Sequence, residues 1–190
     1  MAMRALAIIV ALFAAGSAWA QKNTSVISFG GSDARLCYEA AEISTVSAGT
    51  LGNCNDALQS GELSKRDRIA TLINRGIIQN HHRDYTAAFA DFEAALALNS
   101  KTSAAYVNRG NSYFSTQHYD SAIDDYTTAL QMEPQNSYIA HFNRGLAHEA
   151  QKNVQLALKD FIRVNELRPG WRPAENRLKQ YRKKGVEESH

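Results

Sequence analysis

The sequence predicts an all-α fold of stacked helix pairs, an α-solenoid, and two observations lead to this prediction. The tripeptide Asn-Arg-Gly recurs at residues 74–76, 108–110 and 143–145, with periods of 34 and 35 residues. The stretches between are rich in Ala, Leu and charged residues, and the whole chain has only three prolines, a composition that favours helix over strand. A repeat of this length is a small unit that buries its apolar face by stacking on its neighbours.

Each unit continues with the same pattern of small and aromatic residues, counted from its glycine. A small residue stands 12 positions on, an aromatic residue 16 positions on, and a small or β-branched residue 19 positions on. These three sets are Ala88, Ala122 and Ala157, then Phe92, Tyr126 and Phe161, then Ala95, Ala129 and Val164. Because Gly costs about 1 kcal/mol in a helix relative to Ala, we expect Gly76, Gly110 and Gly145 to face a helix backbone that passes too close for a side chain.

This pattern resembles the tetratricopeptide repeat (TPR) family, in the type found in exported bacterial proteins. The resemblance covers about residues 65–182 and implies a right-handed α-solenoid. The units expected are a degenerate helix pair at 33–64, repeats at 65–100, 101–134 and 135–169, and a capping helix at 170–184. Only the second repeat fits throughout, since Gln79, His141 and His148 stand where the family usually has aromatic or large apolar residues.

The first 20 residues have the features of a secretory signal peptide. Arg4 precedes an apolar stretch, and small residues stand before the cleavage point predicted after Ala20. The residue directly after that point is Gln21 and not Cys, which argues against a lipid anchor. We therefore expect an exported, periplasmic protein. No later stretch approaches the roughly 20 apolar residues of a membrane-spanning helix, so no transmembrane segment is expected in the mature chain. Residues 21–32 and 185–190 are expected to be disordered.

Two cysteines, Cys37 and Cys54, flank a small and polar stretch of the leading helix pair. In an oxidising compartment such a pair favours a disulfide that joins the two helices. Two buried thiols are the alternative.

Three Arg and Asp pairs recur at one spacing of 16 residues: Arg75 with Asp91, Arg109 with Asp125, and Arg144 with Asp160. Opposite charges on helix faces that otherwise pack are most simply explained as ion pairs across the helix hairpin or to the next repeat. We therefore expect them to stabilise the fold rather than to bind a partner.

The amides Asn74, Asn108 and Asn143 occupy a register that the TPR resemblance places on the inner, concave wall. An amide offers donors and an acceptor, the complement of a peptide group, although these residues could equally be a structural habit of the repeat. Residues three and four apart share a helix face. The predicted protein-binding groove consists of Ile73, Asn74, Ile77, Val107, Asn108, Asn111, Phe114, Phe142, Asn143 and Leu146. It contains no Lys or Arg for a terminal carboxylate, so internal peptide segments are the expected ligands.

Catalytic and metal-binding patterns are not found in the sequence. His81, His82 and His118 lie near expected turns, with no Cys or carboxylate at a metal-ligand spacing beside them. The formal net charge of +2 is too small for bulk attraction to nucleic acid. We therefore predict no enzyme, no cofactor and no metal.

The function predicted is that of an adaptor or scaffold that binds an extended or helical segment of a partner protein. One alternative is docking on anionic lipid or polymer through the basic last helix. Its charged residues are Arg172, Glu175, Arg177, Lys179, Arg182, Lys183 and Lys184. Another alternative is a subunit that positions the catalytic partner of an envelope enzyme complex. The sequence does not name the partner, the pathway or the oligomeric state.

Overall fold

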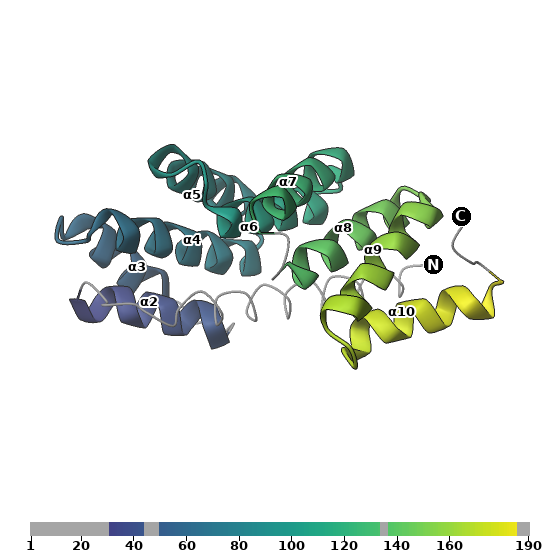
Figure 1. Cartoon of the computed structure of the whole chain (residues 1–190). Helices are drawn as coiled ribbons and strands as arrows, with labels where there is room; N and C mark the ends of the chain where they lie inside the picture. Colours follow the sequence, from purple (N-terminus) through teal and green to yellow (C-terminus); the bar gives the residue numbers. More distant parts are fainter. Residues whose placement is uncertain (1–30, 44–49, 134–136, 186–190) are drawn as a thin grey trace.

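The computed structural model describes residues 31–43, 50–133 and 137–185, and within these ranges the chain forms nine α-helices and no strand. The helices follow one another as an all-α repeat solenoid (Figure 1). Their bounds are α2 Gly31–Ile43, α3 Thr50–Gln59, α4 Lys65–His81, α5 Tyr85–Leu98, α6 Ser103–Ser115, α7 Tyr119–Met132, α8 Tyr138–Ala150, α9 Val154–Leu167 and α10 Arg172–Lys183. None of these helices has the length and apolar character needed to cross a bilayer.

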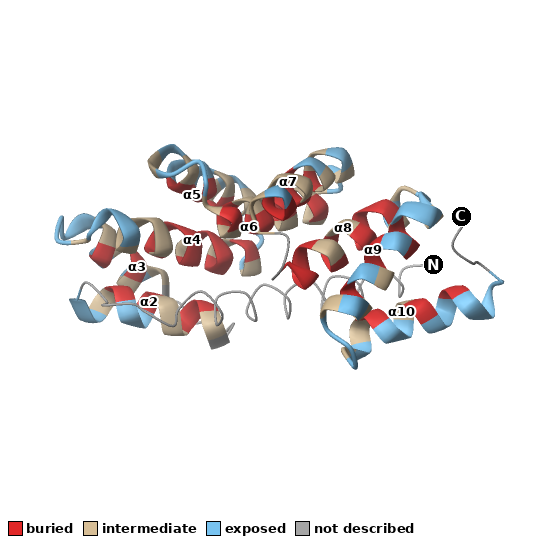
Figure 2. Ribbon diagram, viewed as in Figure 1, coloured by how far each residue is buried: buried red, intermediate tan, exposed pale blue. Residues whose placement is uncertain are grey.

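The helices pair in chain order, and the pairs stack. Helices α4 and α5, α6 and α7, and α8 and α9 form three hairpins, and the first helices α4, α6 and α8 also contact one another in sequence. Helices α2 and α3 pack on α4 at one end of the stack, while α10 packs on α9 at the other (Figure 1). Each helix thus buries the side that faces its neighbours and exposes the opposite side (Figure 2).

The start of α4 agrees with the sequence-based expectation, whereas the starts of α2 and α3 differ from it. Helix α4 begins at Lys65 as predicted, and its N-cap Ser64 accepts a hydrogen bond of 3.1 Å from the backbone N–H of Asp67. Gly31 and Ser32, expected in a disordered segment, are instead the first residues of α2. The small and polar stretch between the two cysteines suggests a turn, but α3 already begins within it, at Thr50. Small polar residues fit a first helical turn as well as a loop, so composition alone misplaced both boundaries. The predicted signal peptide, residues 21–30 and residues 186–190 lie outside the described residues.

The repeated glycines face aromatic rings rather than a helix backbone, which corrects the sequence-based expectation. A Cβ atom on Gly76 would lie 2.6 Å from Cε1 of Phe92, and one on Gly110 would lie 2.7 Å from Cε1 of Tyr126. The third glycine, Gly145, meets the ring of Phe161 in the same way. These rings are 0% exposed, so they fill the space inside each hairpin and have no room to withdraw.

The turn inside each hairpin is built in the same way three times. Arg83, Gln117 and Lys152 adopt φ values of 63°, 65° and 65°, in the left-handed region that non-glycine residues seldom occupy. The next backbone N–H in each case donates to a carbonyl five residues earlier, as in His118 to Tyr113 at 2.8 Å. This is the Schellman arrangement, which satisfies carbonyl groups at the end of the first helix and starts the second.

Candidate protein-binding surface

The ten residues of the predicted groove lie on the first helices of the three repeats. Ile73, Asn74 and Ile77 are on α4, the four residues from Val107 to Phe114 are on α6, and the remaining three are on α8. We refer to these ten residues as the amide stripe. Because α4, α6 and α8 are neighbours in the stack, the stripe is continuous across the repeats.

The amide stripe is less open than the sequence suggested. Nine of its ten residues are buried, with exposed fractions between 0% at Asn143 and 8% at Ile73, and only Asn111 is half-buried. Its apolar members belong to the hydrophobic clusters between repeats, Ile73 and Ile77 to one cluster and Phe142 and Leu146 to the other. These side chains therefore also supply the core that holds the repeats together.

A hydrogen-bond network joins the second and third repeats through the stripe. The amide group of Asn143 donates to Oδ1 of Asn111 at 2.9 Å, and the hydroxyl of Tyr126 donates to the same oxygen at 2.9 Å. Burial, with a further contribution from Asp125, raises the pKa of Tyr126 well above its ordinary value, so the phenol remains a donor. The Oδ1 atom of Asn143 is itself buried and has no hydrogen-bond partner among the described residues.

Asn74 and Asn108, which occupy the position of Asn143 in the first two repeats, have different surroundings. Asn108 donates to the carbonyl of Ala104 at 2.8 Å, one turn earlier on the same helix. No hydrogen bond is found for the side chain of Asn74 within the described part of the chain. Sequence reasoning missed a fourth amide, Asn80 on α4, which accepts from the hydroxyl of Ser112 on α6 at 2.9 Å. Asn80 lies one turn beyond Gly76, so the helix period that defined the stripe could have indicated it.

All three Arg and Asp pairs are present, each within one hairpin. Arg75 donates to the two oxygens of Asp91 at 2.8 and 2.6 Å, Arg109 to Asp125 at 2.9 and 2.8 Å, and Arg144 to Asp160 at 2.9 and 2.7 Å. These bidentate bonds fix both the distance and the orientation of the two helices. Hydrogen bonding to the aspartate raises the pKa of Arg75 and of Arg109, and burial opposes this effect.

Two of these arginines also reach the preceding unit. Arg75 donates to Oδ1 of Asn55 on α3 at 2.7 Å, and Arg144 donates to the hydroxyl of Thr127 on α7 at 3.1 Å. The pairs therefore connect hairpins as well as the helices within a hairpin. Asn55 and Thr127 stand at no common offset from their arginines, so the sequence pattern could not have indicated them.

The third repeat adds a histidine to its ion pair. Nδ1 of His141 lies 2.8 Å from Oδ1 of Asp160, the oxygen that also accepts from Arg144. Burial alone would raise the pKa of Asp160, but the hydrogen bonds from Arg144 and His141 hold it below its ordinary value. His148 lies buried on the same helix, and burial lowers its pKa, with Asp160 opposing and Arg144 assisting.

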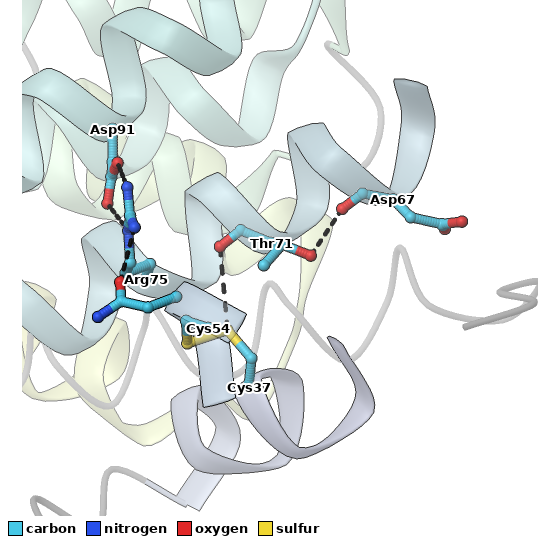
Figure 3. The surroundings of a disulfide bond; sticks show 7 residues. Cys37, Cys54, Asp67, Thr71, Arg75 and Asp91 are labelled. Atoms are coloured by element: carbon cyan, nitrogen blue, oxygen red, sulfur yellow. Dashed lines mark hydrogen bonds and ion pairs between the residues drawn. A yellow bond between two sulfur atoms is a disulfide. The ribbon is translucent and has the colours of Figure 1, made fainter. Parts of the chain in front are cut away.

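The leading helix pair is joined by a disulfide between Cys37 on α2 and Cys54 on α3, with their Cα atoms 4.8 Å apart (Figure 3). Both residues are 0% exposed. The Cys37 sulfur lies 3.9 Å from the carbonyl oxygen of Thr71 on α4, and Arg75 on the same helix lies close by (Figure 3). The disulfide therefore belongs to the contact between the leading pair and the first repeat.

Within the described ranges, no group of three His, Cys, Asp or Glu side chains is placed so that it could hold a metal ion. The turn histidine His118 instead has its Nδ1 atom 3.0 Å from the hydroxyl of Thr116.

Comparison with known proteins connects this geometry to a family. Residues 103–136, the second hairpin, match the tetratricopeptide repeat family model. This match and the relatives below support the resemblance of the repeats to the TPR family. The observed hairpins, each with its glycine, small residue and aromatic ring, repeat the same unit on either side of the matched segment.

Relatives share sequence with only part of this chain. Tetratricopeptide repeat protein 6 of Homo sapiens is 33% identical over 106 residues, which is 54% of this chain and 20% of that protein. The Lipoprotein NlpI homolog of Haemophilus influenzae is 28% identical over 57% of this chain and 34% of its own length. The Heat shock protein sti1 homolog of Schizosaccharomyces pombe is 36% identical over 33% of this chain and 10% of its own. The chain thus spans at most about a third of these relatives.

Solved structures with the same fold include peptide complexes. The first TPR of Spaghetti (RPAP3), bound to the HSP90 peptide SRMEEVD, has a TM-score of 0.59 and 22% identity, covering 64% of this chain and 95% of that one. MamA has a TM-score of 0.64 and 16% identity, and the match covers 79% of this chain and 85% of MamA. A chain of the APC/C hetero-tetramer Cut9-Hcn1 has a TM-score of 0.69 and 20% identity, and the match covers 78% of this chain and 29% of that chain. At these identities the likeness concerns the fold.

Proposed function

We propose that this protein is a non-catalytic adaptor that binds a segment of a partner protein along its first helices, at the amide stripe. TPR relatives and neighbours that bind peptides support the general role of a protein-interaction adaptor. The stripe offers the combination of apolar side chains and amides that suits an extended backbone.

The observation that carries the proposal is hydrogen-bonding capacity left unmet in the stripe. The Oδ1 atom of Asn143 is buried without a partner among the described residues. An unsatisfied buried acceptor costs about 1–3 kcal/mol, and a donor supplied by a ligand would recover that free energy. Asn111, hydrogen-bonded to Asn143 and only half-buried, gives a partner its approach to this site.

The stripe also favours one class of peptide. None of its ten residues is Lys or Arg, so it offers no cation to a terminal carboxylate. The peptides seen with structural neighbours, such as SRMEEVD and SGPTIEEVD, are short acidic segments of HSP90 and HSP70. For this chain the amides and apolar side chains favour internal segments of a partner, whose backbone peptide groups the amides would hydrogen-bond.

The test begins with a crosslinked pull-down to identify a partner, followed by affinity measurements with the purified pair. The triple variant Asn74→Ala, Asn108→Ala and Asn143→Ala removes the amides of the row. If each contributes about 1 kcal/mol, affinity falls by about 3 kcal/mol, roughly a hundredfold. Asn165→Ala on α9 lies outside the stripe and serves as the matched control. An unchanged affinity in a triple variant with the wild-type circular dichroism spectrum would place the binding site elsewhere.

We further propose that the protein is exported to the periplasm. The support is the signal-peptide pattern of the first 20 residues, together with the buried disulfide, since disulfides persist mainly in oxidising compartments. Cell fractionation followed by mass spectrometry of the mature N-terminus tests this location. An uncleaved chain in the cytosolic fraction would contradict it.

A further inference from the structure

The charges of this chain are segregated to the two ends of the solenoid. Residues 31–64 contain five Asp or Glu and one Lys or Arg, a net charge of −4. Residues 152–184 contain ten Lys or Arg and three Asp or Glu, a net charge of +7. The central residues 65–151 are nearly balanced, with eight basic and nine acidic residues. A chain with a net charge of only +2 therefore carries a large charge difference from end to end.

The basic end is displayed on α10. Ala174, Leu178 and Tyr181 are the buried face of this helix, and they pack against the third repeat. The basic residues exposed on the rest of its surface are Arg172, Lys179, Arg182, Lys183 and Lys184. Glu175 is the only exposed acid on the helix, and Arg177 is already paired with Glu149 at 3.1 Å. Glu187 and Glu188 follow in the sequence outside the described residues, and the segment 152–190 remains basic when they are counted.

The acidic end is the disulfide-linked pair α2 and α3. Asp56 and Glu62 are exposed, and Asp33 and Glu42 are half-buried. The one basic residue of this end, Arg35, is paired with Glu39 at 2.8 Å, so it leaves the other acids uncompensated. Leu36 on the outer side of α2 is 37% exposed, which adds an apolar group to this surface.

We infer that the basic end of one copy docks on the acidic end of the next, so that the chain self-associates head to tail. In a solenoid each inner unit is covered by two neighbours, and within the described residues the end units α2–α3 and α10 are each covered by one (Figure 1). Two different surfaces of opposite charge give a heterologous contact, which propagates into open filaments or closes into a ring. The amide stripe takes no part in this contact and remains free for a partner.

A second copy fits the basic end better than a membrane does. A helix that lies on a bilayer inserts an apolar face, and the apolar face of α10 is buried against the third repeat. The acidic end of a second copy, by contrast, needs no apolar face to bind. It is also always present at the same concentration as the basic end, because both ends belong to one chain. Charge complementarity of this kind mainly accelerates encounter and orients the partners, so the association should depend strongly on salt.

Sedimentation velocity of the purified protein over a series of concentrations measures this association directly. At about 20 mM salt the weight-average mass should at least double as the concentration rises, and at about 500 mM salt it should return to that of the monomer, because screening removes the attraction. A monomer at every salt and protein concentration would overturn the inference.

Charge reversal at each end separates head-to-tail contact from other modes. The basic-end variant is Lys179→Glu, Arg182→Glu, Lys183→Glu and Lys184→Glu, which changes the net charge of residues 152–184 from +7 to −1. The acidic-end variant is Asp33→Lys, Asp56→Lys and Glu62→Lys, which changes that of residues 31–64 from −4 to +2. Each variant alone should remain monomeric at low salt, because its two ends now carry the same sign. An equimolar mixture of the two should associate again, because every contact then joins opposite charges.

Two controls complete the experiment. Glu93→Lys with Asp124→Lys reverses two exposed acids on α5 and α7, away from both ends, and should leave the association unchanged. Vesicles of phosphatidylglycerol and phosphatidylethanolamine test the competing occupant. Association that survives both reversals would refute the docking mode, as would a monomer that binds these vesicles through the basic end.

Discussion

At the residue scale, the repeated glycines are held in place by the aromatic rings that face them. Gly110→Ala adds a Cβ atom 2.7 Å from the ring of Tyr126, which is 0% exposed and cannot move aside without disturbing the core. Overpacking of this kind costs about 1–3 kcal/mol and outweighs the gain of about 1 kcal/mol in helix propensity. We expect a lower urea midpoint for the variant. Gly52→Ala on α3 is the matched control, because nothing lies within 4 Å of its added Cβ, and it should stabilise the protein.

A second residue-scale prediction concerns His148 and pH. Burial lowers the pKa of this histidine, with Asp160 opposing the shift and Arg144 assisting it. A His whose folded pKa lies below its unfolded value of about 6.5 contributes stability that is complete above that value and is lost as pH falls. The free energy of unfolding should therefore decrease between pH 7 and pH 5. His81, whose pKa burial and His82 also lower, acts in the same direction.

The variant His148→Gln should reduce this pH dependence, because glutamine keeps a polar group at the site but does not titrate. Urea unfolding at several pH values between about 5 and 7 measures the slope. The depressed pKa of Asp160 does not contribute in this window, since its effect is lost only below about 4. Identical slopes for the variant and the wild type would show that His148 is not the group that titrates.

At the element scale, each hairpin depends on an ion pair between its helices. Asp125 is 5% exposed and both of its oxygens accept from Arg109, so Arg109→Met would leave a buried carboxylate unpaired. We expect a loss of about 2–4 kcal/mol for that variant and a smaller loss for the double variant Arg109→Met with Asp125→Asn. Chemical denaturation of the wild type, the single variants Arg109→Met and Asp125→Asn, and the double variant gives the four free energies of a double-mutant cycle. Additive losses would mean that the two groups do not interact.

The hairpin turns contain a residue whose backbone conformation suits glycine. Gln117 has φ at 65°, where a side chain costs about 1 kcal/mol or more. Gln117→Gly should therefore raise the free energy of unfolding by about 0.5–1 kcal/mol, measured by thermal and urea unfolding. The neighbouring Thr116 has φ at −93°, so Thr116→Gly should lower stability instead. Equal effects at the two positions would show that backbone strain is not the cause.

At the scale of the whole molecule, the sequence predicted the repeat architecture because stacking demands the same residue types at the same spacing. The start of α4, the three hairpins, their ion pairs and the cysteine pairing all follow from local patterns of this kind. The contacts of Arg75 with Asn55 and of Asn143 with Asn111 depend on how successive units are placed, which the period alone does not specify. For the same reason the burial of the amide stripe could not be predicted, since its residues serve the core between repeats and the surface at once.

The disulfide links the stability of the leading pair to that of the solenoid. In a stack, each unit is stabilised mainly by its own contacts and those of its nearest neighbours. The bridge closes a separation of 17 residues, which is worth about 3 kcal/mol by the chain-entropy estimate. The double variant Cys37→Ala and Cys54→Ala should therefore increase hydrogen exchange first in α2 and α3 and next in α4, which touches them.

The far end of the stack provides the internal control for this experiment. Helices α8, α9 and α10 lie at the other end of the stack from the leading pair (Figure 1), so their amide protection should be the same with and without the bridge. Reducing the wild type should reproduce the pattern, while the double variant should not respond to the reductant. A uniform loss of protection along the whole chain would show instead that the solenoid unfolds as a single unit, with the disulfide stabilising every repeat equally.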